Sequence, residues 1–256
     1  MTGSVLAIAQ LTVREAFRKR VFVNLAVFAA LMVGVSLLMT GLTIGQHQRV
    51  IHTVSFTVLA VVGNLLAVFL GAGLIAHEVE RRTLYTIVSR PIRRYVFVLG
   101  RYLGLAVVLA INTIVGGMLV KVVLMVSNWP AFDHFIVSLG LIYVEMLVVL
   151  SISVVFSSFS TPTLSATFGF CFWVIGRLSV ELQELAALAK NDGLAAAMKA
   201  SYTVLPNLGR LDPMNLLIHS KPPDGGHVAM LFAYGLLYVA VMLTVACWTF
   251  ERRDLK

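Results

Sequence analysis

His77 and Glu78 come closest in this sequence to a catalytic or metal-binding pattern. They begin the H-E-x-x-H motif, in which two histidines one helical turn apart bind zinc and the glutamate acts as a general base. Arg81 stands where the second histidine should be, and the six histidines include no pair four residues apart. The G-x-S-x-G nucleophile elbow is also missing from the sequence. We therefore expect no catalytic residue and no metal site in this chain.

The composition indicates whether water or lipid surrounds the chain. Of its 256 residues, 59% are hydrophobic and only 12% are charged, and the mean hydropathy is +0.91. Soluble domains have about 25% charged residues, so there are too few polar side chains here to cover a soluble domain. The sequence predicts a protein embedded in a membrane.

Six stretches are long and apolar enough to cross a bilayer as helices, since a span needs about 20 mostly apolar residues. They are residues 21–44, 53–76, 102–126, 135–156, 162–180 and 228–250. No strand-like alternation is present, which disfavours a barrel. The predicted fold is one all-α membrane domain over residues 1–256, with six transmembrane helices.

The positions of lysine and arginine predict the orientation of the spans. Most of the 20 lysines and arginines lie before the first span, in the 77–101 loop and after the last span. Basic residues near span ends stay in the cytoplasm, so we expect both termini and this loop on the cytoplasmic side. The formal net charge of +8 then reflects membrane insertion and anionic lipid rather than nucleic acid.

Residues 4–21 are predicted to form an amphipathic interfacial helix before the first span. Its apolar side chains share one face at steps of three and four residues: Leu6, Ala9, Val13, Phe17 and Val21. Arg14 and Arg18 lie away from that face, and Glu15 is spaced to pair with Lys19. Such a helix can lie on anionic lipid or dock against another protein, and the sequence fits both.

The segment 77–101 is unusually rich in charge for so apolar a chain. The helical pattern of 53–76 continues past residue 76, Pro91 disfavours helix at Arg90, and a second helix is expected to start near Ile92. Together these features predict a helical hairpin on the cytoplasmic side of the membrane. Its arginines alone could simply satisfy the positive-inside rule. Its acidic and apolar residues favour a surface that meets another protein instead.

The stretch "AHEVERRTLYTIVSRPIRRYVFVLGRYLG" after "REAFRKRVF" resembles the permease subunits of ABC-2 type ABC transporters. In that family the loop between spans two and three has a Glu, then Thr-Leu, a Pro and an Arg, then Gly-Lys. The matching positions are Glu78 or Glu80, Thr83, Leu84, Pro91, Arg94 and Gly100, with Arg101 in place of the Lys and Arg82 where many members have Gly.

The resemblance implies the permease of an exporter in a bacterial-type inner membrane, paired with ABC ATPase subunits and with a second permease copy or paralogue. It implies that the loop and the N-terminal helix contact the ATPase subunit, through Glu78, Glu80, Arg81, Arg82, Thr83, Leu84, Tyr85, Arg90, Pro91, Arg93, Arg94, Arg14 and Arg18. ATP and Mg²⁺ would bind to that partner. A phosphate-binding loop needs G-x-x-x-x-G-K-[ST], and this sequence contains no Gly-Lys pair, so we expect no cofactor on this chain and no enzyme activity of its own.

Four polar residues inside the spans are candidates for the transport pathway or for helix contacts. Glu145 falls near the middle of the fourth span, where a carboxylate is costly and normally faces protein or water. It could be a protonated, hydrogen-bonded packing residue, it could pair with Arg177 or Lys121, or it could line the route of the cargo. Arg177 and Lys121 could instead reach the membrane surface. Asn64 and Asn112 are expected to form interhelical hydrogen bonds.

The outer segment, residues 181–227, is too long for a turn. Its pattern indicates two short amphipathic helices and a proline-punctuated stretch, consistent with a structured cap. Its resemblance to the re-entrant outer helices of the family implies a gate. Two other functions stay open at this stage, namely a non-catalytic membrane anchor or scaffold and an intramembrane enzyme that uses Glu145.

Overall fold

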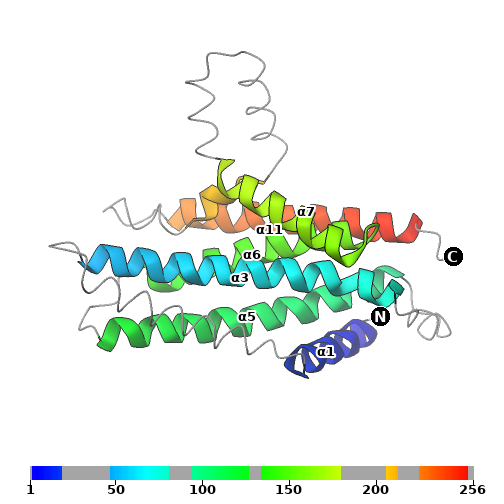
Figure 1. Cartoon of the computed structure of the whole chain (residues 1–256), viewed down its shortest axis with the longest axis horizontal. Coiled ribbons are helices and arrows are strands. Elements are labelled where there is room, and N and C mark those ends of the chain that lie inside the picture. Colours follow the sequence, from blue (N-terminus) through cyan, green and yellow to red (C-terminus); the bar gives the residue numbers. More distant parts are fainter. Residues whose placement is uncertain are drawn as a thin grey trace, which may run out of the picture.

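The computed structural model describes residues 2–18, 47–80, 94–126, 134–179, 206–212 and 225–252. Every regular element in these ranges is a helix, as predicted (Figure 1). The α-helices are α1 (Thr2–Arg18), α3 (His47–Glu80), α5 (Arg94–Val126), α6 (Phe135–Ser157), α7 (Pro162–Arg177) and α11 (Gly225–Arg252), and η1 (Leu208–Leu211) is a short 3₁₀ helix.

Four of these helices are long and apolar enough to cross a membrane. The qualifying stretches are His52–Ile75 in α3, Arg94–Val122 in α5, Phe135–Ser157 in α6 and Gly225–Arg252 in α11. They match the second, third, fourth and sixth predicted spans. The predicted first span lies outside the described residues, so the six-span count stays a prediction.

The helix α7, in the place of the fifth predicted span, is shorter than the others. Its 16 residues correspond to about 24 Å, against roughly 30 Å of hydrocarbon. Pro162 begins the helix at a position where proline is favoured because the missing N–H has no helical partner anyway. A tight turn joins α6 to α7, so the two helices run antiparallel. Residue 177, at the end of α7, is therefore level with the middle of α6 rather than with its far end.

The centre of the bundle is α6, in which 15 of 23 residues are buried. Small residues let α3 approach it closely: a Cβ on Gly71 would lie 2.7 Å from Cβ of Ser153. Ser157 Oγ also donates to the carbonyl oxygen of Ala72 at 2.8 Å and accepts from the backbone N–H of Ile75 at 3.0 Å. Close contacts of small residues and interhelical hydrogen bonds are what hold helices together in lipid.

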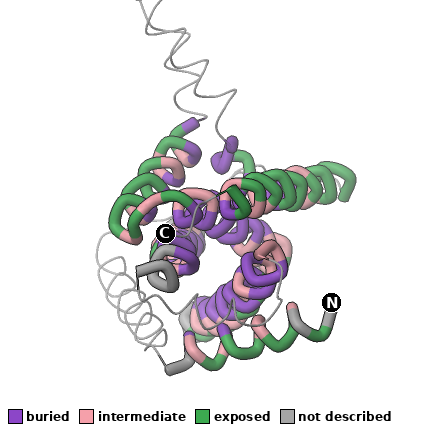
Figure 2. The backbone as a smooth tube through the Cα atoms, turned by 90° about the vertical axis from the view of Figure 1, so that its right-hand side faces the viewer, coloured by how far each residue is buried: buried purple, intermediate pink, exposed green. Residues whose placement is uncertain are grey.

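The outer faces of the bundle are apolar. Figure 2 looks along the bundle and shows buried residues toward its centre and exposed residues toward its rim. Leu237 on α11 and Met118 on α5 are among the exposed apolar side chains. An apolar surface of this kind suits contact with acyl chains.

The ends of four helices meet at one end of the bundle, which we call the α1 end. It contains α1, the end of α3, the start of α5 and the end of α11, so both described termini lie there (Figure 1). The predicted hairpin falls between α3 and α5. The end of α3 and the start of α5 are helical as expected, and residues 81–93 lie outside the described residues.

The helix α1 packs against α5 through a face that the sequence did not identify. Leu6, on the predicted apolar face, is 63% exposed, as on a helix whose apolar face meets lipid, whereas Thr12 and Ala16 are buried. The reason is the close approach of α5. A Cβ on Gly104 would lie 2.6 Å from Cβ of Thr12 and 2.8 Å from the carbonyl oxygen of Ala9, and Gly100 contacts α1 in the same way. Small residues, rather than the most apolar ones, therefore form this contact.

We predict that Gly104→Ala loosens α1 from α5 and lowers the free energy of unfolding by about 1–3 kcal/mol, as overpacking typically does. Unfolding of the full-length protein in detergent micelles measures this loss. Gly3→Ala is the matched control, because no atom lies within 4 Å of the added Cβ and alanine favours helix. Equal stability of the two variants would show that the glycine contact does not hold α1.

Candidate functional site

Glu145 lies at the middle of α6 and is completely buried. Its Oε1 accepts hydrogen bonds from Asn64 Nδ2 at 3.1 Å, from Trp173 Nε1 at 3.3 Å and from Arg177 Nη1 at 3.1 Å. Arg177 Nη1 also lies 3.1 Å from Oε2. Donors from α3 and α7 thus converge on one carboxylate of α6, an arrangement that complements the ionised form of the acid.

Arg177 joins a second carboxylate to the first. Its Nη2 donates to Asp212 Oδ2 at 2.7 Å, just after η1. The arginine side chain is 19% exposed and that of Asp212 is 22% exposed. We call Glu145, Arg177 and Asp212 the charge cluster. With both acids ionised it carries one positive and two negative charges, held in a largely apolar bundle where unpaired charge is costly.

The segment 206–212 is fixed against the bundle on both sides of the cluster. Ser179 Oγ donates to Asn207 Oδ1 at 2.9 Å, and the backbone N–H of Asn207 donates to Tyr234 Oη of α11 at 3.0 Å. Leu208 and Leu211 have no exposed surface. This short piece of the predicted outer segment therefore sits between α6, α7 and α11 rather than covering the bundle from outside.

Of the two expected partners of Glu145, the structure shows Arg177, and Lys121 is exposed on α5. A role of Glu145 in lining the route of the cargo stays a prediction. The expectation that Arg177 reaches the membrane surface is wrong, because the short helix α7 leaves this residue level with Glu145. Asn64 forms an interhelical hydrogen bond, as expected. Asn112 is buried on α5, and the hydrogen bonds of the charge cluster do not involve it.

Two members of this site were missed by the sequence reasoning. Trp173 was not noticed because an aromatic residue in an apolar helix is common. Asp212 was not noticed because it lies in a loop-like stretch far along the chain. It is, however, the only acidic residue in "LPNLGRLDPMNLL". A search for the counter-charge of a mid-span arginine could have found it.

A second set of charged contacts joins helices at the α1 end. Arg101 Nη1 of α5 lies 2.8 Å from Glu15 Oε2 of α1, so Glu15 is bound across helices and not only placed to pair with Lys19, which lies outside the described residues. Arg94 Nη1 lies 3.2 Å from the carbonyl oxygen of Glu251 and 3.4 Å from that of Phe250. A cation on the last carbonyls of α11 stabilises the end of that helix.

The expected partner-contact residues are described only in part. Arg14 is exposed on α1, and Arg18 is the last residue of that helix. Glu78 and Glu80 belong to the last turn of α3. The remaining loop residues lie outside the described residues: Arg81, Arg82, Thr83, Leu84, Tyr85, Arg90, Pro91 and Arg93. Arg94, the last of the set, is the one used in the contact with α11.

Comparison with known families gives one match that covers nearly the whole chain. The family described as "ABC-2 family transporter protein" matches residues 6–255. The matched region begins within α1 and extends past the end of α11, so it includes the charge cluster and both sides of the predicted hairpin. Curated proteins give no significant match.

We predict that Arg177→Met destabilises the protein by about 3–5 kcal/mol, because it leaves Glu145 buried without a positive partner. The double variant Glu145→Gln with Arg177→Met should lose less stability than Arg177→Met alone. The reason is that the double variant no longer contains the uncompensated carboxylate. Unfolding in detergent micelles measures both.

Arg14→Met is the control, because Arg14 is an exposed arginine of α1, which contributes no residue to the charge cluster. Surface changes usually stay within about 0.5 kcal/mol. If Arg177→Met were no more damaging than Arg14→Met, the charge cluster would not hold the bundle together.

Proposed function

This chain belongs to the ABC-2 family of transporter proteins and is a membrane-embedded permease of an ABC transporter; we propose that it is the permease subunit of an exporter, driven by a separate ATPase. The family match over residues 6–255 is the observation that carries the proposal. Membership in this family implies an ABC ATPase partner. The lack of any Gly-Lys pair in the sequence supports placing the nucleotide site on that partner.

The proposed topology has six spans, with the α1 end facing the cytoplasm of a bacterial-type inner membrane. The gathering of the basic N-terminal helix, both sides of the 81–93 segment and the end of α11 at one end of the bundle supports it (Figure 1). Basic segments near span ends remain on the cytoplasmic side. A second permease copy or paralogue would complete a two-sided pathway, and the exposed apolar faces of α7 and α11 suit contact with lipid or with that copy.

We propose that the ATPase subunits act on the hairpin between α3 and α5 and on α1. The helix α3 has 34 residues, about 50 Å in length, so a displacement at Glu80 would be carried into the membrane by one continuous helix. The helix α5 begins directly after the hairpin and holds α1 through the glycine contact and the Arg101–Glu15 ion pair. Both helices next to the hairpin would then move with it.

The charge cluster is the proposed link from this movement to the opposite half of the bundle. Asn64 of α3 donates to Glu145, which shares Arg177 with Asp212. A shift of α3 along α6 would change the first of these contacts, and the shared guanidinium would pass the change to the segment 206–212. In this mechanism the segment acts as the gate on the outer side. The several donors around Glu145 favour this role over an acid–base reaction on the same carboxylate.

We predict that Glu80→Lys or Arg81→Glu weakens binding of the ATPase subunit and uncouples ATP hydrolysis from transport. Charge reversal replaces an attractive contact by a repulsive one in the proposed interface. Co-purification of the native complex, followed by ATPase and transport assays in proteoliposomes, measures both effects. Thermal unfolding should be unchanged, since the sequence predicts both residues in the cytoplasmic hairpin, outside the spans.

Lys121→Glu serves as the control, because this exposed lysine lies far from the α1 end on α5. ATPase co-purification should survive that change. Full coupling in the Glu80 and Arg81 variants would reject the hairpin as the coupling element. Isolation of the native particle with no ATPase bound would reject the proposed function itself.

A further inference from the structure

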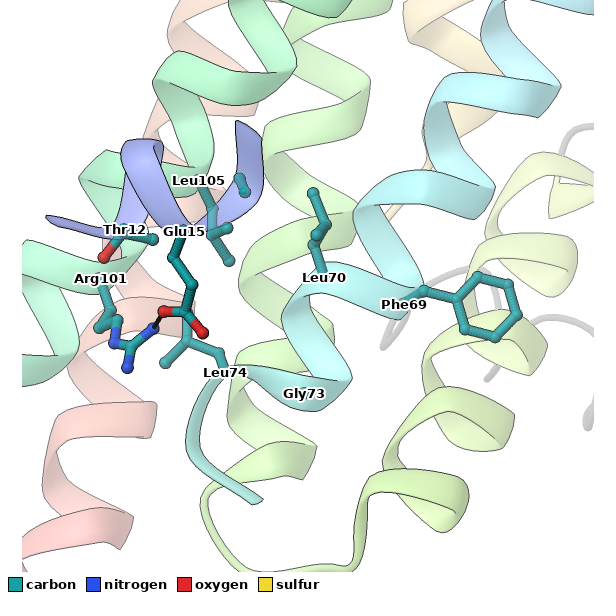
Figure 3. Close-up of a pocket in the computed structure, with 9 residues that line it drawn as sticks. Thr12, Glu15, Phe69, Leu70, Gly73, Leu74, Arg101 and Leu105 are labelled. Carbon is teal, nitrogen blue, oxygen red and sulfur yellow. Dashed lines mark hydrogen bonds and ion pairs between the residues drawn. The ribbon is translucent and has the colours of Figure 1, made fainter. Parts of the chain in front are cut away.

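A pocket of about 170 Å³ lies between α1, α3 and α5 at the α1 end of the bundle (Figure 3). One of its ends is charged, with the Glu15 and Arg101 side chains 2.8 Å apart and Thr12 beside them. The other end is apolar. It is lined by Leu70 and Phe69 of α3, whereas Leu74 lies beside the Glu15–Arg101 pair (Figure 3). The pocket therefore offers both charge signs and an apolar wall to one ligand.

The apolar end opens toward the outside of the bundle. Phe69 is 65% exposed and points away from the Glu15–Arg101 pair (Figure 3). It lies six residues before the end of the apolar stretch His52–Ile75, about 9 Å along the helix toward the bundle interior. The charged end lies beside α1, which exposes Leu6 and Leu11 as an interfacial helix does. The charged part of the pocket thus lies beside the interfacial helix α1, and Phe69 lies on the exposed face of α3.

We propose that this pocket binds the headgroup of a membrane phospholipid with a primary ammonium group, of the ethanolamine type. The phosphate lies against the Arg101 guanidinium, the ammonium against the Glu15 carboxylate, and an acyl chain against Leu70 and Phe69. A guanidinium has five N–H donors and a carboxylate about four acceptor positions, so both groups can bind the headgroup while they bind each other. The proposal is independent of the ATPase partner.

The charges select among headgroups. Glu15 disfavours a headgroup that carries only negative charge, because the phosphate would lie next to a carboxylate. A primary ammonium donates hydrogen bonds to a carboxylate, whereas a quaternary ammonium has no N–H and is recognised by aromatic faces. Phe69, the aromatic residue among those that line this pocket, lies at the apolar end. Such a lipid would connect α1 with α3, which the Arg101–Glu15 pair alone does not reach.

Native mass spectrometry of the full-length protein, delipidated in mild detergent, tests the proposal. Dioleoyl lipids with ethanolamine, choline or glycerol headgroups are added at equal concentration, and glycerophosphoethanolamine serves as the soluble headgroup without chains. We expect the ethanolamine lipid to bind at least about fivefold more tightly than the other two, as one or two charge-assisted hydrogen bonds allow.

Two variants separate lipid binding from structural effects. The double variant Glu15→Arg with Arg101→Glu keeps an ion pair between α1 and α5 but exchanges the positions of its charges, so the preference for ethanolamine lipid should be lost while the melting temperature is retained. Phe69→Ala should weaken lipid binding severalfold, whereas Met230→Ala, an equally exposed apolar residue of α11, should not.

Equal binding of the three lipids, or an unchanged preference in the charge-exchanged variant, would overturn the proposal. Tight binding of glycerophosphoethanolamine that Phe69→Ala leaves intact would also overturn it, because the ligand would then be a soluble phosphate compound rather than a membrane lipid.

Discussion

The architecture depends on one buried carboxylate. Glu145 sits at the centre of the most buried helix, where an ionised group must be paired and hydrogen-bonded. Arg177 supplies the positive charge, and it reaches Glu145 because α7 is only 16 residues long. The same guanidinium binds Asp212, which holds the segment 206–212 between three helices. This single electrostatic requirement accounts for the short helix α7, for the position of η1 and for the approach of α3 through Asn64.

At the α1 end, small residues hold the helices together, as the charge cluster does in the middle of the bundle. In lipid, helices gain little from burying apolar surface against each other, so close backbone approach and polar contacts hold them together. Gly104 and Gly100 bring α1 against α5, and the Arg101–Glu15 pair fixes the register. In the proposed function, this ABC-2 permease is driven by a separate ATPase. The proposed route runs from this rigid end along α3 to the charge cluster.

Much of this organisation could be predicted from the sequence, because hydropathy and charge report directly on a membrane environment. The four described spans, the helix before the first span and the family all follow from such local patterns. The contact partners of individual side chains were harder to predict. The level of Arg177 along α6 depends on where α7 ends, and Asp212 comes from a segment distant in the sequence. Predicting that these two residues pair therefore requires the three-dimensional fold. The face of α1 that packs against α5 could not be predicted for a related reason: only a small side chain such as that of Thr12 fits against Gly104, and this pairing appears only in the fold.

Distance measurement between spin labels at positions 210 and 121 tests the central claim most directly. Arg210→Cys and Lys121→Cys would be placed in a background without Cys171 and Cys247, within the complex with its ATPase, whose hydrolysis is blocked. If the charge cluster holds the outer segment and transmits the movement of α3, ATP should shift the distance between the labels. Asp212→Asn should shift it without ATP. A distance that responds neither to ATP nor to Asp212→Asn would contradict the account.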